Sequence, residues 1–183
     1  VNALGSGLSG TSQVVSALAI DGSGNVYVGG ILATVSNIGM WNGTSWSTLS
    51  AGLNNEVFAL AFAPNGDLYI GGRFTDAAYP YLCKWNGTAF SVVGTNTDIN
   101  AKVFELAFDA TGWLYVGGNF TNAGGIPNAD MIAKWNGSQW ESLGTGVEGT
   151  VGGIVVNSGK VYAAGLFTSA GGLTLTDRVA VWS

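Results

Sequence analysis

Histidine is absent from the 183-residue sequence, cysteine occurs once, and lysine and arginine together number six. Histidine is the commonest general base and metal ligand near neutral pH, so its absence argues against the most frequent kinds of catalytic and metal site. A single cysteine, Cys83, excludes a disulfide within the chain and is expected to be a small buried core residue. Six basic residues and a net charge of −5 argue against nucleic acid as a partner, because phosphate binding needs a basic surface.

High charge and long apolar runs are also missing. Charged residues make up 9% of the chain and aromatic residues 11%, which argues against disorder. The apolar runs are too short to span a bilayer, since a transmembrane helix needs ~20 consecutive apolar residues. Neither a signal-peptide pattern nor an initiator methionine is visible, as expected of a processed chain or of part of a longer one.

The sequence does contain a fourfold repeat of short apolar segments. Each copy has an apolar strand, a VYVGG-type run, a variable loop and a second apolar run that ends in tryptophan. The VYVGG-type runs and the tryptophans that follow them are at 26–30 and Trp41, 68–72 and Trp85, 114–118 and Trp135, and 161–165 and Trp182. A period of roughly 40 to 50 residues made of short strands is typical of β-propellers. The sequence therefore predicts an all-β, four-bladed propeller with four antiparallel strands per blade.

The fourth repeat is incomplete, and its missing part resembles the other end of the chain. It stops at Trp182-Ser183, whereas VNALGSG at 1–7 aligns with WESLGTG at 140–146. The prediction is one domain over 1–183, with blades at approximately 14–49, 57–93, 103–143 and 151–183 plus 1–7. The N-terminal strand would complete the last blade and close the ring without an open sheet edge. A half-ring that pairs with a second copy is the alternative.

Three Asn-Gly pairs, at 42–43, 86–87 and 136–137, follow tryptophans. Asn-Gly favours a two-residue hairpin turn in which both central residues have positive φ. The same asparagines fit the N-glycosylation pattern, but turn chemistry explains their recurrence first. The DGSGN segment at 21–25 lacks the acidic residue that would finish a calcium loop, so it too is interpreted as a turn.

The segment LYVGGNFTNAGG…IAKWNGSQWESLGTG at 114–146 resembles a kelch-like propeller repeat. Repeats of this kind occur in secreted and surface-anchored bacterial proteins and in fungal cortical marker proteins. The resemblance covers the whole chain and is weakest in the first copy, where GGILATVS replaces GGxFTxAGG. It implies a propeller fold, an extracellular or cell-surface setting and a binding or scaffolding role, but no particular ligand.

Catalytic motifs are not found. Carboxylates are scattered, and the unusual one is Glu105, on a predicted innermost strand where the other copies have small residues. Glu105 is interpreted as lining a hydrated central channel. We therefore expect a protein that is not an enzyme, with no catalytic residues, no metal and no cofactor.

The variable loops carry the functional prediction. The connections from the second to the third strand of a blade, and from one blade to the next, share one face of a propeller and vary in length, although drift at permissive positions would give the same variation. Their neutral polar residues suit a neutral glycan or a protein partner. Phenylalanines 74, 120 and 167 recur at one position and are expected to pack between blades. The alternative function is a self-assembling subunit, of a surface layer, filament or spacer, whose terminal strand pairs with a neighbouring chain. The candidate ligand residues are Asn54, Asn55, Asp76, Tyr79, Tyr81, Asn96, Asp98, Asn100, Asn122, Asn128, Asp130 and Asp177.

Overall fold

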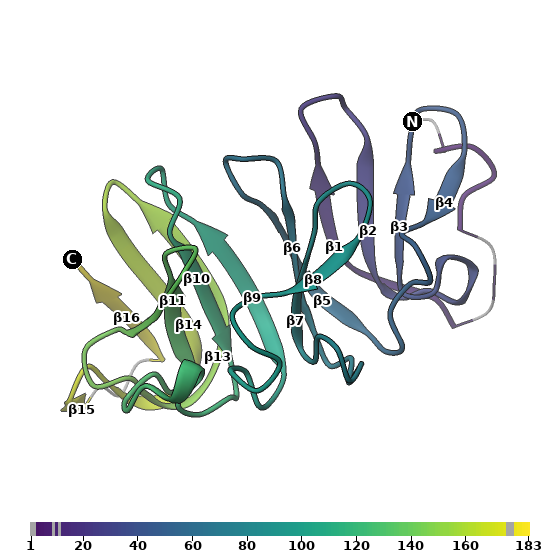
Figure 1. The fold of residues 1–183 in the computed structure, drawn as a ribbon. Helices are drawn as coiled ribbons and strands as arrows, with labels where there is room; N and C mark the ends of the chain where they lie inside the picture. Colours follow the sequence, from purple (N-terminus) through teal and green to yellow (C-terminus); the bar gives the residue numbers. More distant parts are fainter. Residues whose placement is uncertain (1–2, 9, 11, 175–177) are drawn as a thin grey trace.

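The computed structural model describes residues 3–8, 10, 12–174 and 178–183, which form four antiparallel sheets standing in a row (Figure 1). We name the sheets blades 1 to 4 in chain order. Blade 1 comprises β1 (Val14–Ile20), β2 (Val26–Ile31), β3 (Ile38–Trp41) and β4 (Trp46–Thr48); blade 2 β5 (Val57–Phe62), β6 (Leu68–Gly72), β7 (Leu82–Trp85) and β8 (Phe90–Val92); blade 3 β9 (Val103–Phe108), β10 (Leu114–Gly118), β11 (Ile132–Trp135) and β12 (Trp140–Ser142); and blade 4 β13 (Val147–Asn157), β14 (Lys160–Ala170), β15 (Leu173–Thr174) and β16 (Val179–Trp182). Two single-turn 3-10 helices, at Ala33–Val35 and Ala123–Gly125, lie in the loops of blades 1 and 3.

The strand order confirms the predicted propeller architecture. In blades 1 to 3 each strand pairs with the next along the chain, so each repeat forms one four-stranded meander. In blade 4, β16 pairs with β14, and the two-residue β15 pairs with the far end of the same strand. The innermost strands β1, β5, β9 and β13 contact one another in sequence, as blades around a common axis do.

Close approach of neighbouring blades depends on glycine in each second strand. At Gly71 the Cβ of any other residue would stand 2.5 Å from Cγ1 of Val103, which is fully buried in blade 3. Only a residue without Cβ permits this spacing. An aromatic pair adds to the same boundary, because the rings of Tyr69 and Phe108 form a T-shaped contact with centroids 5.2 Å apart. The same glycine–valine contact is repeated between Gly29 and Val57 and between Gly117 and Val151.

The Asn-Gly turns close in a different way from the one predicted. Residues 86–89 form a four-residue connection, in which Gly87 has a φ of 96° whereas Asn86 does not have positive φ. The side-chain oxygen of Asn86 accepts hydrogen bonds from the N–H groups of Thr88 and Ala89, at 3.0 and 2.9 Å. Asn42 and Asn136 bind their own turns in the same way. The turn assignment is confirmed, but the two-residue type with two positive φ angles was wrong, because the asparagine side chain takes over the closure.

Three further predictions about the core and the turns are confirmed. Cys83 is buried, and burial raises the pKa of its thiol. The carboxylate of Asp21 accepts hydrogen bonds from the N–H groups of Ser23 and Asn25, both at 2.9 Å, so DGSGN forms a turn around its own aspartate. The recurring phenylalanines are almost completely buried, at Phe74, Phe120 and Phe167. Within the described ranges, none of the helices is long and apolar enough to cross a membrane.

Closure of the ring within one chain is not confirmed. The row of blades is open, with the two chain ends at its opposite ends (Figure 1). Leu4 and Leu8, which precede β1, lie on blade 1 instead of blade 4: the Trp46 indole donates to the carbonyl of Leu4 at 3.2 Å, and Leu8 packs beside Val28. Four blades at this spacing do not turn far enough to bring blade 4 to the N-terminal segment. Val1 and Asn2, part of the predicted closing strand, lie outside the described residues.

Candidate binding groove between blades 2 and 3

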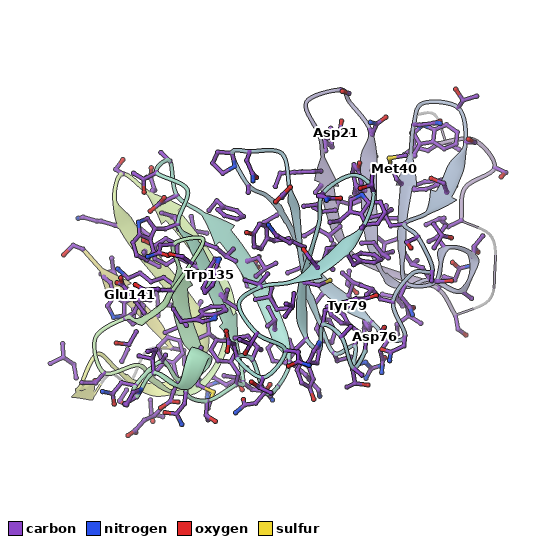
Figure 2. All side chains as sticks on the ribbon, viewed as in Figure 1. Asp21, Met40, Asp76, Tyr79, Trp135 and Glu141 are labelled. Atoms are coloured by element: carbon purple, nitrogen blue, oxygen red, sulfur yellow. The ribbon has the colours of Figure 1, made fainter. Side chains whose placement is uncertain are left out.

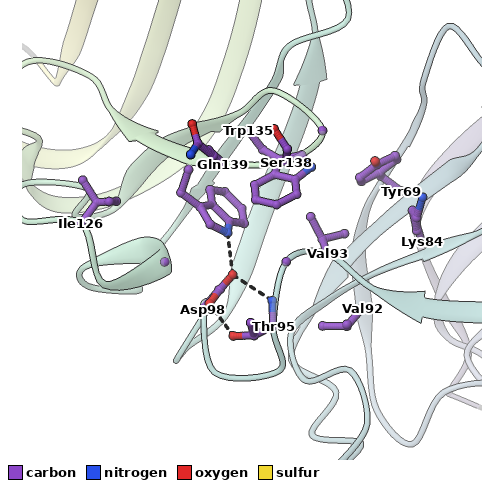
Figure 3. A pocket seen from close by; sticks show the side chains of 14 residues that line it. Tyr69, Lys84, Val92, Val93, Thr95, Asp98, Ile126, Trp135, Ser138 and Gln139 are labelled. Atoms are coloured by element: carbon purple, nitrogen blue, oxygen red, sulfur yellow. Dashed lines mark hydrogen bonds between the residues drawn. The ribbon is translucent and has the colours of Figure 1, made fainter.

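A groove of about 730 Å³ lies between blades 2 and 3 at the outer rim of the arc (Figure 3). We call it the rim groove. Blade 2 supplies one wall through β6, β7 and the end of β8, and blade 3 supplies the other through the turn that joins β11 to β12. The loop from β8 to β9 closes one end. The residues used below are Tyr69, Lys84, Thr95, Asp98, Trp135, Ser138, Gln139 and Trp140.

Asp98 organises the closed end of the rim groove. Its carboxylate accepts hydrogen bonds from the Thr95 N–H at 2.9 Å, from the Thr95 hydroxyl, and from the Trp140 indole at 3.0 Å. The first two bonds shape the loop between blades, and the third joins that loop to β12 (Figure 3). A charged acceptor makes these bonds stronger than neutral ones. One carboxylate therefore fixes both the loop and the tryptophan.

Aromatic rings form the floor. Trp135 and Trp140 are a cross-strand pair with ring centroids 5.2 Å apart, and both are buried. Tyr69 contributes a third buried ring from blade 2. Burial raises the pKa of the Tyr69 hydroxyl, so this phenol is neutral at physiological pH. The floor therefore offers apolar edges and neutral polar atoms.

The lysine in the lining is already paired. The Lys84 ammonium lies 3.0 Å from the carboxylate of Asp67. This hydrogen bond raises the pKa of Lys84 despite partial desolvation of the ammonium. Because its charge is matched within blade 2, Lys84 provides little net attraction for an anion, and the rim groove suits a neutral ligand better than a phosphate.

The opposite lip of the rim groove is the Asn-Gly turn of blade 3. Asn136 holds this turn by accepting from the N–H groups of Ser138 and Gln139, at 2.9 and 2.8 Å. Both residues are exposed, and the Gln139 amide has no hydrogen-bond partner within the described parts of the chain. A fixed backbone with an available amide can recognise a hydroxylated ligand.

Most of the predicted loop residues bind other loops rather than line the rim groove. Of the candidates that the structure describes, Asp98 is the one in its wall. Asn54 accepts from the Thr75 N–H at 2.9 Å, and Asn96 donates to the carbonyl of Ala77 at 3.1 Å. Comparable loop contacts are made by Asn55 with Arg73, Asn100 with Thr121, and Asp130 with the N–H of Asn122.

Three of the remaining candidates, Tyr79, Tyr81 and Asn128, have conformational or packing roles. Tyr79 packs against Phe90 with centroids 5.5 Å apart, and Tyr81 and Asn128 have positive φ angles of 63° and 65°. Figure 2 shows Asp76 and Tyr79 together at one end of the sheets, opposite the Asp21 turn. Asp177 lies outside the described residues. Asp76, Tyr79, Tyr81 and Asn128 do not line the rim groove, and a ligand role for them stays a prediction.

Sequence reasoning missed Trp140 and Gln139 as groove residues. Trp140 was assigned to the repeat and Gln139 to the turn. Both assignments are correct, but they do not indicate that the two residues line a groove. Trp140 lies 42 positions from Asp98, and no pattern in the sequence indicates that their side chains meet. The available signal was that Gln139 stands where blade 2 has Ala89, a change to a longer amide in an otherwise constant turn.

Glu105 lies on β9, on the axis side of blade 3, and is half-buried. Burial raises the pKa of its carboxyl, and a hydrogen bond from the Leu106 N–H at 3.2 Å lowers it by a smaller amount. The environment of Glu105 therefore favours the protonated carboxyl more strongly than the hydrated channel that we expected would do.

Neither family models nor curated proteins match this sequence, so the comparisons rest on solved structures. The chain is similar to the computationally designed Ika8 protein, with a TM-score of 0.61 and 19% identity over 98% of this chain and 48% of that one. It is also similar to an ancestral GH74 enzyme, with a TM-score of 0.55 and 19% identity over 81% of this chain and 21% of that one. Virginiamycin B lyase from Staphylococcus aureus is similar with a TM-score of 0.52 and 12% identity, over 96% of this chain and 57% of that one.

The fold is that of a β-propeller. The chain spans less than two thirds of the length of each of these structures, and identities of 12% to 19% establish the fold alone.

The expectation that the chain is not an enzyme is contradicted by these neighbours, which include a GH74 enzyme and a lyase. The reason is physical: a propeller presents residues from many loops on a rigid frame, so the same frame supports catalysis and binding. Lack of histidine does not exclude catalysis, since paired carboxylates also act as acid and base.

Proposed function

We propose that this chain is an extracellular or cell-surface binding module that holds a neutral, polyhydroxylated ligand, such as a glycan, in the rim groove. The observation that carries the proposal is the arrangement around Asp98. Aromatic edges from Trp135 and Trp140 lie beside the hydroxyl of Thr95 and the amide of Gln139, with no unpaired basic side chain among the described lining residues. Sugars are bound by this combination of apolar contact and neutral hydrogen-bonding groups.

Composition and the repeat support this proposed setting. A chain with 9% charged residues and a sequence like the kelch-like repeats of surface proteins suits an extracellular location. Because the lysine near the groove is neutralised by Asp67, binding is expected to depend weakly on ionic strength. A phosphorylated or nucleic acid ligand would behave in the opposite way.

The test is a titration with a panel of neutral oligosaccharides, followed by Gln139→Ala on any that bind. The turn of blade 2 already has alanine at this position, Ala89, so the substitution is compatible with the fold. We expect the affinity to fall about tenfold through loss of one or two hydrogen bonds. Ser45→Ala is the matched control, because Ser45 holds the same turn position in blade 1, away from the groove.

The proposal fails if no neutral oligosaccharide binds. It also fails if a bound sugar is insensitive to Gln139→Ala, or equally sensitive to Ser45→Ala. A strong loss of affinity at high salt would indicate a charged ligand and a different site.

A further inference from the structure

Both ends of the arc expose apolar sheet faces. On blade 1 the side turned away from blade 2 carries Leu18 and Ile20, which are 64% and 66% exposed. On blade 4 the side turned away from blade 3 carries Val155 and Val181, with Tyr162 between them in register. Contiguous exposed apolar surface of this kind marks an interaction site on a soluble protein. We call these surfaces the blade 1 face and the blade 4 face.

The blade 1 face is equivalent to surfaces that are buried elsewhere in the same chain. By strand register, Leu18 corresponds to Leu106 in blade 3 and Ile154 in blade 4. These two side chains are only 5% and 6% exposed. Ile154 packs under Gly117 of the preceding blade. Leu18 thus has the position and chemistry of a residue that packs on a preceding blade.

The blade 4 face has the complementary character. Tyr162 corresponds to Tyr27 and Tyr69, each of which meets a phenylalanine of the following blade edge-on, at 5.3 and 5.2 Å between centroids. Tyr162 has no such ring contact in the described residues. If a blade 1 followed blade 4, Ile20 would occupy the position of that phenylalanine and would face Tyr162.

The N-terminal segment has the shape of a loop between blades. The Gly7 N–H donates to the Leu4 carbonyl at 3.1 Å, as the Gly146 N–H does to the Leu143 carbonyl where blade 3 leads into blade 4. Gly5 and Gly144 both have a φ of 60°. The segment therefore enters blade 1 as if it came from the outermost strand of another blade. Within the described residues, β16 of blade 4 has no strand on its outer side.

We propose that a second copy of this chain covers both faces. Blade 4 of each copy packs against blade 1 of the other, so that two arcs close into one ring around a two-fold axis. The two contacts are identical by symmetry, and closure leaves no apolar face open. The length agrees, because the chain matches the Ika8 structure over 98% of itself and 48% of that structure.

The new boundary is not a copy of the internal ones. Ala164 occupies the position at which the internal boundaries have glycine, and Val155 occupies the position at which blades 1 to 3 have alanine. The blade 4 face therefore carries larger side chains. Opposite them, Ile20 replaces the phenylalanine of blades 2 and 3. Added volume on one face is offset by lost volume on the other, as packing at constant density requires.

The first experiment measures mass in solution by sedimentation velocity. The unaltered chain is expected to sediment as a dimer, and Leu18→Asp and Val155→Asp each as monomers, because a carboxylate would be buried at both boundaries. Both residues are exposed in the single chain, so the variants should fold, which far-ultraviolet circular dichroism checks. Ser91→Asp, at the exposed middle position of β8, adds the same charge elsewhere and should remain dimeric.

Mixing the two monomeric variants tests the head-to-tail arrangement. A mixed pair confines both aspartates to one boundary, which can stay open to water, and leaves the other boundary unaltered. The mixture should therefore recover a heterodimer. A contact between like faces cannot give this result, because one of the two variants would then dimerise alone.

A designed disulfide tests the strand that completes blade 4. By alignment with Ser142, which pairs with Ala133, Ala3 should lie beside Ala180 of the second copy. Blade 2 already has Cys83 at the position of Ala180, so cysteine fits there. A mixture of Ala3→Cys and Ala180→Cys chains should form a disulfide-linked heterodimer on oxidation, while Cys83 remains buried and inert.

Three results would overturn the proposal. In the first, the unaltered chain is a monomer at about 100 μM, a concentration well above the Kd of a specific dimer. In the second, the measured mass exceeds that of two copies. In the third, the Leu18→Asp and Val155→Asp variants are still dimers. The first would leave the faces to be covered by further blades of a longer chain. None of these results bears on the rim groove, which lies between blades 2 and 3.

Discussion

The indole N–H of Trp140 donates a hydrogen bond to the carboxylate of Asp98, 3.0 Å away, across the boundary between blades 2 and 3. Asp98 lies in the loop that enters blade 3, and Trp140, 42 positions later, lies on the outermost strand of that blade, β12. This single contact holds the loop in place and shapes the closed end of the rim groove.

Loss of the Asp98 carboxylate should destabilise the fold. Asp98→Ala removes the acceptor for the Trp140 indole and for two Thr95 donors, so we expect the free energy of unfolding to fall by about 1–3 kcal/mol. Urea denaturation followed by tryptophan fluorescence measures this change. Asp76→Ala is the control, since the Asp76 carboxylate has no hydrogen bond in the described part of the chain. Equal losses in the two variants would mean that the indole contact contributes nothing specific.

The sequence predicted the blades because each repeat is locally determined. Alternating apolar residues, a glycine pair and an asparagine turn define strands whose pairing partners are neighbours along the chain, as at Leu68 with Trp85. Contacts that depend on the angle between blades were not accessible in this way. The open arc and the placement of Leu4 on blade 1 depend on how far four blades turn, which no local pattern encodes.

The candidate site was less predictable for a related reason. Asparagines and aspartates in loops satisfy backbone groups as readily as they bind ligands. Asn54 and Asn96 were identified correctly as loop residues, but both are engaged with neighbouring loops. The rim groove depends on a turn residue, Gln139, and on a tryptophan that the repeat pattern had already explained.

Gly87→Val should destabilise the protein through backbone strain alone. Gly87 has a φ of 96°, and a Cβ there would meet no atom within 4 Å, so steric crowding does not contribute. A β-branched residue in this region costs about 1–2 kcal/mol. Gly22→Val is the matched control, because Gly22 lies in an equally open turn without positive φ. Thermal unfolding of both variants separates the two effects, and similar melting temperatures would contradict the assignment.

Gly71→Ala should push blades 2 and 3 apart. Its Cβ would stand 2.5 Å from Cγ1 of Val103, so we expect a loss of about 1–3 kcal/mol from overpacking. Adding Val103→Ala removes the clashing methyl groups, and the double variant should therefore be more stable than the two single changes predict by addition. Gly153→Ala, on an inner strand with open space around the added methyl, is the control. Strict additivity of the two changes would show that the blades adjust without strain.

Glu105→Gln should stabilise the protein near neutral pH and much less in acid. Burial raises the pKa of Glu105 above its usual 4.5, so the folded chain binds this proton more readily than the unfolded chain. The stability contributed by the protonated form is therefore present below the unfolded pKa and is lost as pH rises through the folded pKa. Glutamine has no charge to desolvate, so the gain in melting temperature over the unaltered chain should be larger at about pH 7 than at about pH 4. Calorimetry at both pH values measures the difference in melting temperature between the variant and the unaltered chain. The other carboxylates titrate in both proteins, so their effect is removed from this difference. A gain that is constant with pH, or larger in acid, would show that Glu105 is as well hydrated in the folded chain as in the unfolded one.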